Sequence, residues 1–280
     1  MKHARRVGFQ GERGAFSEVA AQKLVPDPPQ PMELVPLPSF PDLFRALAAG
    51  KIDYAVVPIE NTLAGSVHEN YDLLLKYRLP ILLETRVRIV HNLIAPRGVS
   101  LRSVRRVYSH PVALRQCLRF LDRHRRWEVV PFYDTAGSVK MLMEKQVTDA
   151  AAIASANAAS LYHARILARD IGDDRQNYTR FFLLGSRAKA RANRSGVKTS
   201  IVFTTGNLPG ALFRCLSVFA LRDINLTKIE SRPLVGRPWE YLFYLDFLGN
   251  PRTPKCRNAL KNLEEITEFL RVLGCYSTVA

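Results

Sequence analysis

The sequence is poor in cysteine and has no long apolar run, and both absences narrow the class of protein. Its 280 residues include 4 cysteines, which form no CxxC pair, so neither a disulfide framework nor a cysteine zinc site is indicated. No stretch approaches the roughly 18 apolar residues of a membrane-spanning helix. The opening residues, Met1 to Gln10, lack the apolar segment of a secretion signal, so we expect a cytoplasmic protein without a membrane partner.

Motifs for bound cofactors are missing as well. Gly8, Gly11 and Gly14 have the spacing GxxGxxG, which differs from the GxGxxG of dinucleotide-binding sites, and no phosphate-binding GKS or GKT sequence occurs. No GxSxG nucleophile elbow is present. The 6 histidines show no HExxH or other metal-ligand spacing. We therefore expect neither a metal nor a cofactor.

Positive charge is what the chain has in excess. It carries 41 Lys and Arg against 25 Asp and Glu, a formal net charge of +16, and the densest stretch runs from Arg97 to Arg126. Such an excess fits nucleic acid, an acidic membrane surface or an anionic small molecule as partner. Because these arginines are not interleaved with aromatic residues, and no zinc-finger, RNP or KH motif occurs, we expect no nucleic-acid partner. A solvated surface is the simplest interpretation of the patch.

The first two thirds of the chain alternate strand-like and helical runs, which predicts an α/β fold with mostly parallel strands. Ser39, Asp134 and Ser155 are typical helix N-caps, and Pro26 to Pro38 is predicted as a proline-rich loop. The expected strands are residues 7–9, 55–57, 104–108, 128–132, 150–154 and 181–184, with helices at 15–24, after Ser39, through Phe120, after Asp134 and up to Tyr162.

The polar, basic segment 186–198 predicts a linker, because it has almost no large apolar residue. After it the pattern becomes strand 200–204, helix 209–220, strands 226–231 and 241–247, helix 255–265 and strand 269–272. This βαββαβ order is that of a ferredoxin-like unit. The sequence thus predicts a large α/β domain, 1–185, followed by a small α+β domain, 199–280.

Small polar residues follow several of the predicted strands, at the N-termini of helices. Such N-termini present unpaired N–H groups that suit carboxylates and phosphates, and in an open α/β sheet ligands gather at the carboxyl ends of the strands. Thr179-Arg180-Phe181 stands at the start of the apolar run that closes the large domain. An arginine beside a hydroxyl can hold a carboxylate while the hydroxyl donates a hydrogen bond. We therefore expect a small anionic ligand in a cleft.

Segments of both domains resemble known sequence blocks. Those of the large domain are similar to prephenate dehydratase, and Thr179-Arg180-Phe181 matches the TRF signature of that family. In the small domain, Pro209 to Leu212 resembles the GALV motif of the ACT regulatory domain, and Glu230 to Pro233 matches its ESRP motif. The blocks of the large domain are Gly8–Ala21, Val57–Leu75, Tyr108–Cys117, Ala151–Leu161 and Asn177–Gly185.

The resemblance implies a fold and a reaction. The large domain would be similar to type-II periplasmic binding proteins, with lobe one near 1–78 and 166–185 and lobe two near 79–165. The reaction would be decarboxylative dehydration of prephenate, a dianionic small molecule, to phenylpyruvate in phenylalanine biosynthesis, without a cofactor. The ACT domain implies feedback inhibition by phenylalanine bound at a subunit interface, and hence a homodimer or homotetramer.

Thr179, Arg180 and Phe181 are the catalytic residues that the resemblance implies. Loss of carbon dioxide and hydroxide makes the ring aromatic, so the leaving hydroxyl needs a hydrogen-bond donor, and the resemblance gives that role to Thr179. Arg180, or the caps at Thr62–Ser66, would hold the side-chain carboxylate, while the ring carboxylate that leaves lies near Phe181. The expected substrate-binding residues are Asn61, Thr62, Gly65, Ser66, Ser109, His110, Thr135 and Ser155.

The phenylalanine site is expected at the start of the first ACT helix, where N–H groups suit an amino-acid carboxylate. Ser231 and Arg232 are expected to transmit binding to the catalytic lobes. The residues of this site are Asn207, Leu208, Gly210, Ala211, Leu212, Glu230, Ser231 and Arg232.

Two features depart from the family pattern. Thr62 replaces the serine that is usual after Glu-Asn, which keeps the hydroxyl. The sequence from Asp134 to Gly137 resembles plant-type relatives that prefer arogenate. Arogenate has an amine with which Asp134 would pair, so both prephenate and arogenate stay candidate substrates.

A non-enzymatic, amino-acid-responsive binding or sensor protein is a further alternative. A ligand-gated transcription regulator would need a helix-turn-helix segment, for which we find no spare residues.

Overall fold

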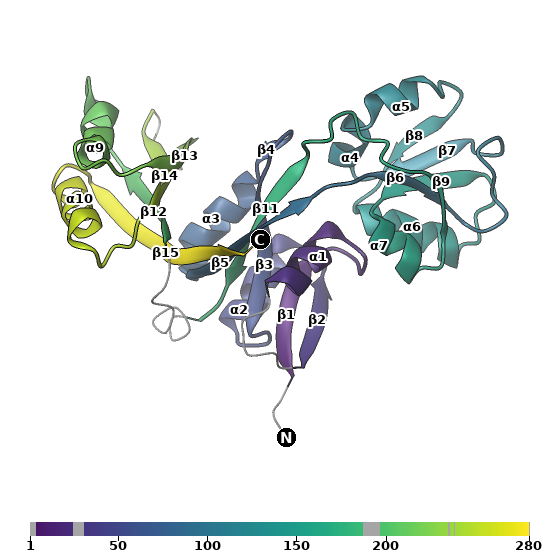
Figure 1. Ribbon diagram of the computed structural model, residues 1–280, viewed down its shortest axis with the longest axis horizontal. Helices are drawn as coiled ribbons and strands as arrows, with labels where there is room; N and C mark the ends of the chain where they lie inside the picture. Colours follow the sequence, from purple (N-terminus) through teal and green to yellow (C-terminus); the bar gives the residue numbers. More distant parts are fainter. Residues whose placement is uncertain (1–3, 25–30, 187–196, 235, 238, 280) are drawn as a thin grey trace. The chain divides into compact units, whose positions relative to one another are not determined.

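The structure is a computed structural model that describes residues 4–24, 31–186, 197–234, 236–237 and 239–279. It divides into two compact units (Figure 1). The first unit contains the chain as far as Leu75 and from Thr85 to Leu183, and the second contains Lys76–Glu84 and the chain from Leu184 to Val279. The first unit consists of two lobes that are built on different sheets.

Lobe one is a sheet with helices packed on it. Its elements are β1 (Arg5–Gln10), α1 (Phe16–Lys23), β2 (Met32–Leu37), α2 (Phe40–Ala48), β3 (Tyr54–Asn61), β4 (Gly65–Ser66), α3 (His68–Tyr77), β5 (Ile81–Arg88) and β11 (Tyr178–Leu184). The strand order is β5-β11-β3-β1-β2, and β4 pairs with β3. α2 begins where the sequence predicts, because Ser39 accepts a hydrogen bond from the backbone N–H of Asp42.

Lobe two has a five-stranded sheet with helices on both faces. Its elements are β6 (Asn92–Ala95), β7 (Arg106–Ser109), α4 (Pro111–Arg115), α5 (Leu118–Asp122), β8 (Glu128–Pro131), α6 (Thr135–Glu144), β9 (Ala150–Ala154), α7 (Ala156–Leu161) and β10 (Arg165–Ala168). The strand order is β10-β6-β9-β7-β8. Leu114 packs on one face and Leu142 on the other. Every residue of β9 is buried, as expected for a strand covered on both sides.

The chain crosses between the two lobes twice, and the two crossings are hydrogen-bonded to each other. Residues 89–91 form the first crossing and residues 169–177 form the second. The N–H of Ile89 donates to the carbonyl of Asn177 at 2.8 Å, and the N–H of Ile171 donates to the carbonyl of His91 at 2.9 Å. These backbone bonds fix His91 and Asn177 at the junction of the lobes.

The second unit has the predicted βαββαβ order. Its elements are β12 (Lys198–Thr204), α9 (Ala211–Ala220), β13 (Leu226–Pro233), β14 (Tyr241–Leu248), α10 (Pro254–Glu265) and β15 (Phe269–Val279). The sheet order is β13-β14-β12-β15, with the start of β5 next to β15. Phe203 and Phe247 pack with Phe219 of α9 and Leu263 of α10, so both helices cover one face of this sheet (Figure 1).

Two elements differ from the sequence expectations. Residues 32–37 form β2 rather than part of a loop. β2 is the last strand of its sheet and pairs with β1, and an edge position tolerates Pro36 because its outer side needs no N–H. The rest of the predicted loop, from residue 25 to 30, is not among the described residues. The helix predicted through Phe120 is interrupted at Gln116 and Cys117, so it forms α4 and α5.

The lobe boundaries also differ. β5, expected in lobe two, lies beside β11 in lobe one, and β10, expected from residue 166 in lobe one, pairs with β6 in lobe two. These strands are placed by long-range pairing, which neighbouring residues in the sequence do not encode. Of the predicted linker, residues 187–196 fall outside the part that the structure describes, and Lys198 already belongs to β12.

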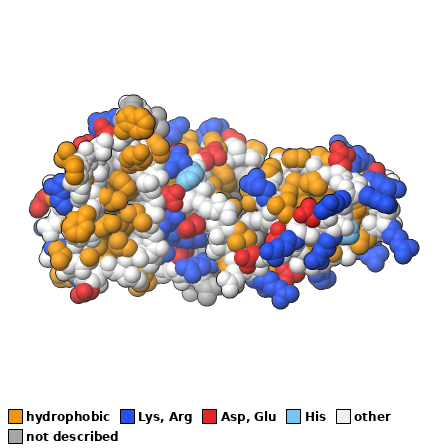
Figure 2. Space-filling view, turned by 90° about the horizontal axis from the view of Figure 1, so that it is seen from above, with side chains coloured by type: hydrophobic (Ala, Val, Ile, Leu, Met, Phe, Trp, Pro, Cys, Tyr) orange, Lys and Arg blue, Asp and Glu red, His pale blue; other side chains and the backbone are white. Residues whose placement is uncertain are grey.

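Arginine side chains gather on the surface of lobe two, where Figure 2 shows blue groups close together. Arg106 is paired with Asp149 at 2.7 Å, and most of the other arginines of the predicted patch are exposed to solvent. None of the helices in the described ranges is both long and apolar enough to cross a membrane.

The second unit contains a buried ion pair between strands. Lys198 Nζ donates to both carboxylate oxygens of Glu84, at 3.0 and 3.2 Å, and the two side chains are 7% and 0% exposed. Thr278 adds a third hydrogen bond to this carboxylate. Removal of one member would leave the other charge buried, which costs more than the pair contributes.

We predict that Glu84→Gln lowers the free energy of unfolding by about 3–5 kcal/mol, because Lys198 then loses its compensating charge. Urea unfolding followed by circular dichroism measures the change. The matched control is Arg237→Gln, which removes exposed pairs with Glu240 and Glu268 in the same unit and should change stability by less than about 1 kcal/mol. Equal effects of the two substitutions would contradict the prediction.

Candidate active site

A cavity of about 450 Å³ lies between the two lobes of the first unit. Lobe one contributes the end of β3, the β4 turn and β11, and lobe two contributes the starts of α4 and α6. The cavity thus lies at strand ends and helix starts, where α/β proteins bind ligands. The predicted residues that line it are Asn61, Gly65, Ser66, His110, Thr135, Thr179 and Phe181.

The strand alternation of β11 decides which part of the TRF signature reaches the cavity. Thr179 and Phe181 line it, whereas the residue between them points to the other side of the strand. Arg180 does not line the cavity; its guanidinium lies over the Phe182 ring at 4.7 Å and 3.7 Å from a carboxylate oxygen of Glu60. The expectation that Arg180 holds the substrate carboxylate is therefore not met by this geometry.

Asn61 connects Thr179 to lobe two. Its Nδ2 donates to Asn177 Oδ1 at 2.7 Å, and its second proton is shared by Thr179 Oγ1 at 3.0 Å and the carbonyl of Tyr178 at 3.1 Å. Its Oδ1 accepts from the backbone N–H groups of Leu63 and Ala64, at 3.0 and 2.9 Å. Because the amide nitrogen donates to the threonine oxygen, the threonine hydroxyl keeps its own proton for another acceptor.

Gln116 is a site residue that the sequence analysis did not single out. Its Nε2 donates to Asn61 Oδ1 at 3.0 Å, and its Oε1 accepts from Asn177 Nδ2 at 2.9 Å. Its Oε1 also lies 2.8 Å from His91 Nε2. Gln116 stands in the segment Tyr108–Cys117 that resembles the family, so this block was the available signal. Asn177 is at the start of another such block, and His91 has no comparable signal.

Asp134 lines the cavity but is already engaged by backbone groups. Its Oδ1 accepts from the N–H of Gly137 at 2.7 Å, which caps α6 as predicted. Burial raises the pKa of this carboxyl, and hydrogen bonds from the backbone of Gly137, Glu12 and Ala136 oppose the rise. Asp134 therefore serves at least to hold the start of α6 against the loop before α1.

That loop, Gly11–Gly14, joins the lobes. Glu12 accepts from Tyr133 and Lys140 of lobe two, both at 3.0 Å. Gly14 lies so close to α7 that a Cβ there would be 2.8 Å from Ala158 Cα, and its carbonyl accepts from Ser155. Its φ of +89° also suits glycine.

Three predicted substrate-binding residues make structural contacts instead of lining the cavity. Thr62 Oγ1 donates to the carbonyl of Gln176 and accepts from the N–H of Tyr178, which fastens the end of β3 to β11. Ser109 is fully buried and donates to the carbonyl of Ile153. Ser155 caps α7 and donates to Gly14.

His110 lines the cavity and also caps α4, where its Nδ1 accepts from the N–H of Val112 at 3.2 Å. Burial lowers the pKa of His110, and the charge of Arg115 lowers it further. Both cavity histidines, His91 and His110, are thus held toward the neutral form, since the pKa of His91 is also lowered, mainly by burial.

The predicted effector residues fall into two groups in the second unit. Gly210, with φ +75°, is the N-cap of α9, and the exposed residues Asn207 and Leu208 precede it; Ala211 and Leu212 begin the helix. Glu230, Ser231 and Arg232 lie on β13. β14 separates β13 from β12, so the groups belong to strands roughly 10 Å apart in the sheet.

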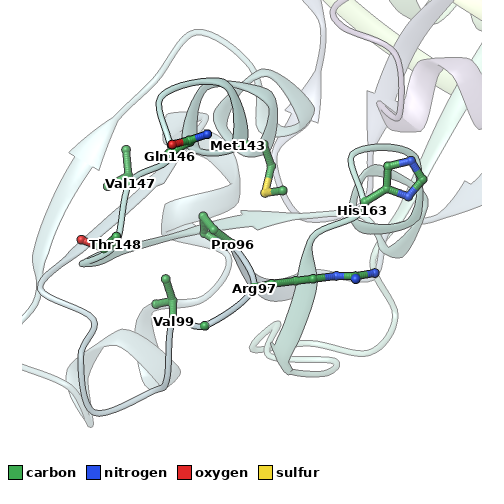
Figure 3. A pocket seen from close by; sticks show the side chains of 9 residues that line it. Pro96, Arg97, Val99, Met143, Gln146, Val147, Thr148 and His163 are labelled. Atoms are coloured by element: carbon green, nitrogen blue, oxygen red, sulfur yellow. The ribbon is translucent and has the colours of Figure 1, made fainter.

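A second cavity, of about 830 Å³, lies in lobe two (Figure 3). Arg97 and His163 stand on one side of it, and Gln146, Val147 and Thr148 stand on the other (Figure 3). It contains none of the predicted site residues. In the described ranges, no group of His, Cys, Asp and Glu is arranged to hold a metal ion.

The fold and the cavity define a two-lobed α/β protein with a candidate small-molecule site between its lobes. The family model of prephenate dehydratase matches residues 7–189. The chain belongs to this family, which confirms the resemblance noted in the sequence, and it is accordingly a lyase of the hydro-lyase class.

Individual proteins are similar over nearly the whole chain. Arogenate dehydratase/prephenate dehydratase 2 of Arabidopsis thaliana is 46% identical, covering 97% of this chain and 72% of the relative. The structure of prephenate dehydratase from Arthrobacter aurescens in complex with L-Phe is 32% identical, with a TM-score of 0.86, and covers 97% of this chain and 89% of that one. A structure described as a novel type of quorum quenching acylase is also 32% identical, with a TM-score of 0.85 and 97% coverage of both chains.

We predict that Asn61→Asp lowers kcat about 10²–10³-fold, the usual loss when one polarising donor is removed. The new carboxylate still accepts from the N–H groups of Leu63, Ala64 and Gln116. It can no longer donate to Thr179 Oγ1 as the amide does, and instead it accepts the hydroxyl proton of Thr179. Steady-state kinetics measure the loss, and the melting temperature reports on folding. Asn157→Asp makes the same chemical change at an exposed position of α7 and should leave kcat unaltered.

Proposed function

We propose that the chain catalyses the decarboxylative dehydration of prephenate to phenylpyruvate, with arogenate as the second candidate substrate. The observation that carries the proposal is the bond from Asn61 to Thr179 Oγ1 in the cavity between the lobes. Thr179 is thereby a positioned donor whose proton is directed to a ligand. Two structures at 32% identity have different described activities, so the site residues, more than the fold, support this assignment.

The leaving hydroxyl needs a donor because negative charge develops on its oxygen as the C–O bond breaks. A threonine hydroxyl is a very weak acid, so Thr179 polarises the oxygen rather than transferring a proton to it. The aromatic ring that forms supplies the driving force. The network from Asn61 to Gln116 holds the hydroxyl in one orientation, which removes the cost of orienting it during the reaction.

The two carboxylates of the substrate require different surroundings. The side-chain carboxylate is an anchor, and Ser66 and Thr135, at the two sides of the cavity, are the hydroxyls we assign to it. The ring carboxylate leaves as neutral carbon dioxide, so a strong charge pair there would stabilise the ground state and slow the reaction. Phe16 and Phe181 provide the less polar part of the lining.

The charge of the side chains that line the cavity supports arogenate as the second candidate substrate. Among the described residues around the cavity none is lysine or arginine, and Asp134 is there. Arogenate carries an ammonium group and one less net negative charge than prephenate, so it needs less compensation. The name of the Arabidopsis relative contains both activities.

We propose that the second unit is an ACT regulatory domain that binds phenylalanine. The βαββαβ order and the sheet order β13-β14-β12-β15 support this, as does the L-Phe in the Arthrobacter aurescens structure. Within one chain, the start of α9 follows β12, and the ESRP segment lies on β13, with β14 between these two strands. A phenylalanine site that uses both segments would therefore take one of them from a second copy of the chain.

The surface of the second unit also supports a homo-oligomer. Phe213 of α9 is 73% exposed, and Leu208, Leu221 and Trp239 are exposed to a similar degree. Figure 2 shows orange side chains gathered over this unit. Contiguous exposed apolar surface of this kind is typical of an interface between subunits.

Turnover of prephenate and arogenate, side by side and with and without phenylalanine, tests the proposed function. We predict that Thr179→Val lowers kcat about 10²–10³-fold on the substrate used, with little change in KM, since the hydroxyl acts on the developing charge. Thr179→Ser keeps the hydroxyl and should retain most of kcat. No turnover above spontaneous decay by the wild type, or normal kcat in Thr179→Val, would overturn the assignment.

We predict that Phe213→Glu lowers the oligomeric mass, because a charge in the centre of an apolar contact is left without compensation. Size-exclusion chromatography with light scattering measures the mass, and phenylalanine binding should weaken together with it. Val129→Glu, at an exposed apolar position of lobe two, is the matched control and should leave both unchanged. A wild type that is monomeric would contradict the proposed interface.

A further inference from the structure

His91 is a buried side chain of the cavity that the mechanism above does not use. It is 3% exposed and lies at the first crossing between the lobes. Its ring meets the ring of Phe16 edge to face, with centroids 5.8 Å apart. Like Thr179, it lines the cavity.

The hydrogen-bond network fixes which nitrogen of His91 carries the proton. Backbone N–H groups can only donate, so the bonds from Leu63 and Ala64 identify the acceptor atom of Asn61 as oxygen. Gln116 must then donate its amide nitrogen to that oxygen, which leaves Gln116 Oε1 as an acceptor.

The remaining bond follows from this assignment. Because Gln116 Oε1 accepts, the proton of the neutral His91 ring is on Nε2, at 2.8 Å. The other nitrogen, Nδ1, therefore presents a lone pair. In the described part of the chain Nδ1 is buried and has no hydrogen-bond partner, so it is the one position of this network left for a ligand or a proton.

The reaction requires a proton that the network does not otherwise supply. Hydroxide leaves the ring, and Thr179 is too weak an acid to protonate it. The lining holds no lysine or arginine in the described chain, so an incoming anion meets no fixed cation. A bound anion raises the pKa of a nearby imidazole, and Nδ1 is the free position where the proton would add.

We propose that His91 is the general acid of the reaction: it takes up a proton on Nδ1 when the anionic substrate binds and delivers that proton to the leaving hydroxyl. This inference rests on the proposed dehydratase function. Thr179 polarises the oxygen and His91 protonates it.

The step balances in atoms and charge. The ring carboxylate loses its C–C bond to the ring as carbon dioxide, and that electron pair completes the aromatic system. The C–O bond at the opposite ring carbon breaks, and its oxygen takes the Nδ1 proton to become water. Prephenate, with two negative charges, and imidazolium thus give phenylpyruvate with one negative charge, carbon dioxide, water and neutral His91.

Burial lowers the pKa of His91 and so favours its neutral form, and the hydrogen bond to Gln116 only partly offsets this. The elements around it are α1, α4 and the second crossing, and three of their acidic groups have other partners. Glu18 pairs with Arg13, Asp170 with Arg88, and Asp173 accepts from the N–H of Arg119. The other titratable groups on these elements or in the cavity are Lys23 of α1, His110, Arg115, Tyr133, Asp134, and Arg169, Asp174 and Arg175 of the second crossing.

The test is the pH profile of kcat/KM for prephenate, with spontaneous decay subtracted at each pH. If the productive complex needs a proton that free His91 lacks, kcat/KM of the wild type falls about tenfold per pH unit between roughly pH 6.5 and 8.5. A wild type that turns over prephenate with a flat profile would overturn the role of His91 but not the function. A wild type without turnover would overturn both.

Two variants assign the slope to one histidine. His91→Gln keeps a donor for Gln116 but cannot titrate, so kcat/KM should fall about 10²–10⁴-fold at pH 6.5 and lose its pH dependence. His110→Gln removes the other cavity histidine and should keep the slope. A pH dependence of kcat/KM that persists in His91→Gln, or disappears in His110→Gln, would refute the proposal. Melting temperatures identify a variant that fails to fold. In that case the wild-type pH profile alone tests the role of His91.

Discussion

The side-chain amide of Asn61 is the interaction on which the rest of the site depends. It donates to the hydroxyl of Thr179 and accepts from Gln116 of the opposite lobe. Two backbone N–H groups fix its orientation, so the direction of every neighbouring hydrogen bond follows from it. A residue at the end of β3 thereby determines the direction of the hydrogen bonds of Gln116 and Asn177 and, through Gln116, which nitrogen of the neutral His91 ring carries the proton.

The described residues that line the cavity include no lysine or arginine, so most of its polar groups are neutral side chains held in fixed positions. A fixed guanidinium would bind a dianion strongly, but it would also hold the carboxylate that must leave as carbon dioxide. The structure instead places Arg180 on the far side of β11, and the polar part of the cavity lining consists of amides, hydroxyls, imidazoles and Asp134 beside apolar side chains. A proton taken up at His91 when the substrate binds, as proposed above, would compensate the anion only while it is bound.

The fold could be predicted where neighbouring residues determine it. Ser39, Asp134 and Ser155 cap helices as expected, since a cap is a local hydrogen bond. The βαββαβ order of the second unit followed from apolar runs of the right lengths. The lobe assignment of β5 and β10 did not, because it depends on pairing with strands far away in the sequence.

The site could be predicted only in part, for a related reason. The resemblance selected segments that contribute to the cavity, but of the side chains expected in them Thr62, Ser109, Ser155 and Arg180 do not line it. In β11 the alternation of a strand separates Thr179 from Arg180. In the segment around Ser109, it is Gln116 at the end of α4 that reaches across to Asn61. His91 belongs to no such segment, and only the crossing of the chain between two sheets places its ring in the cavity.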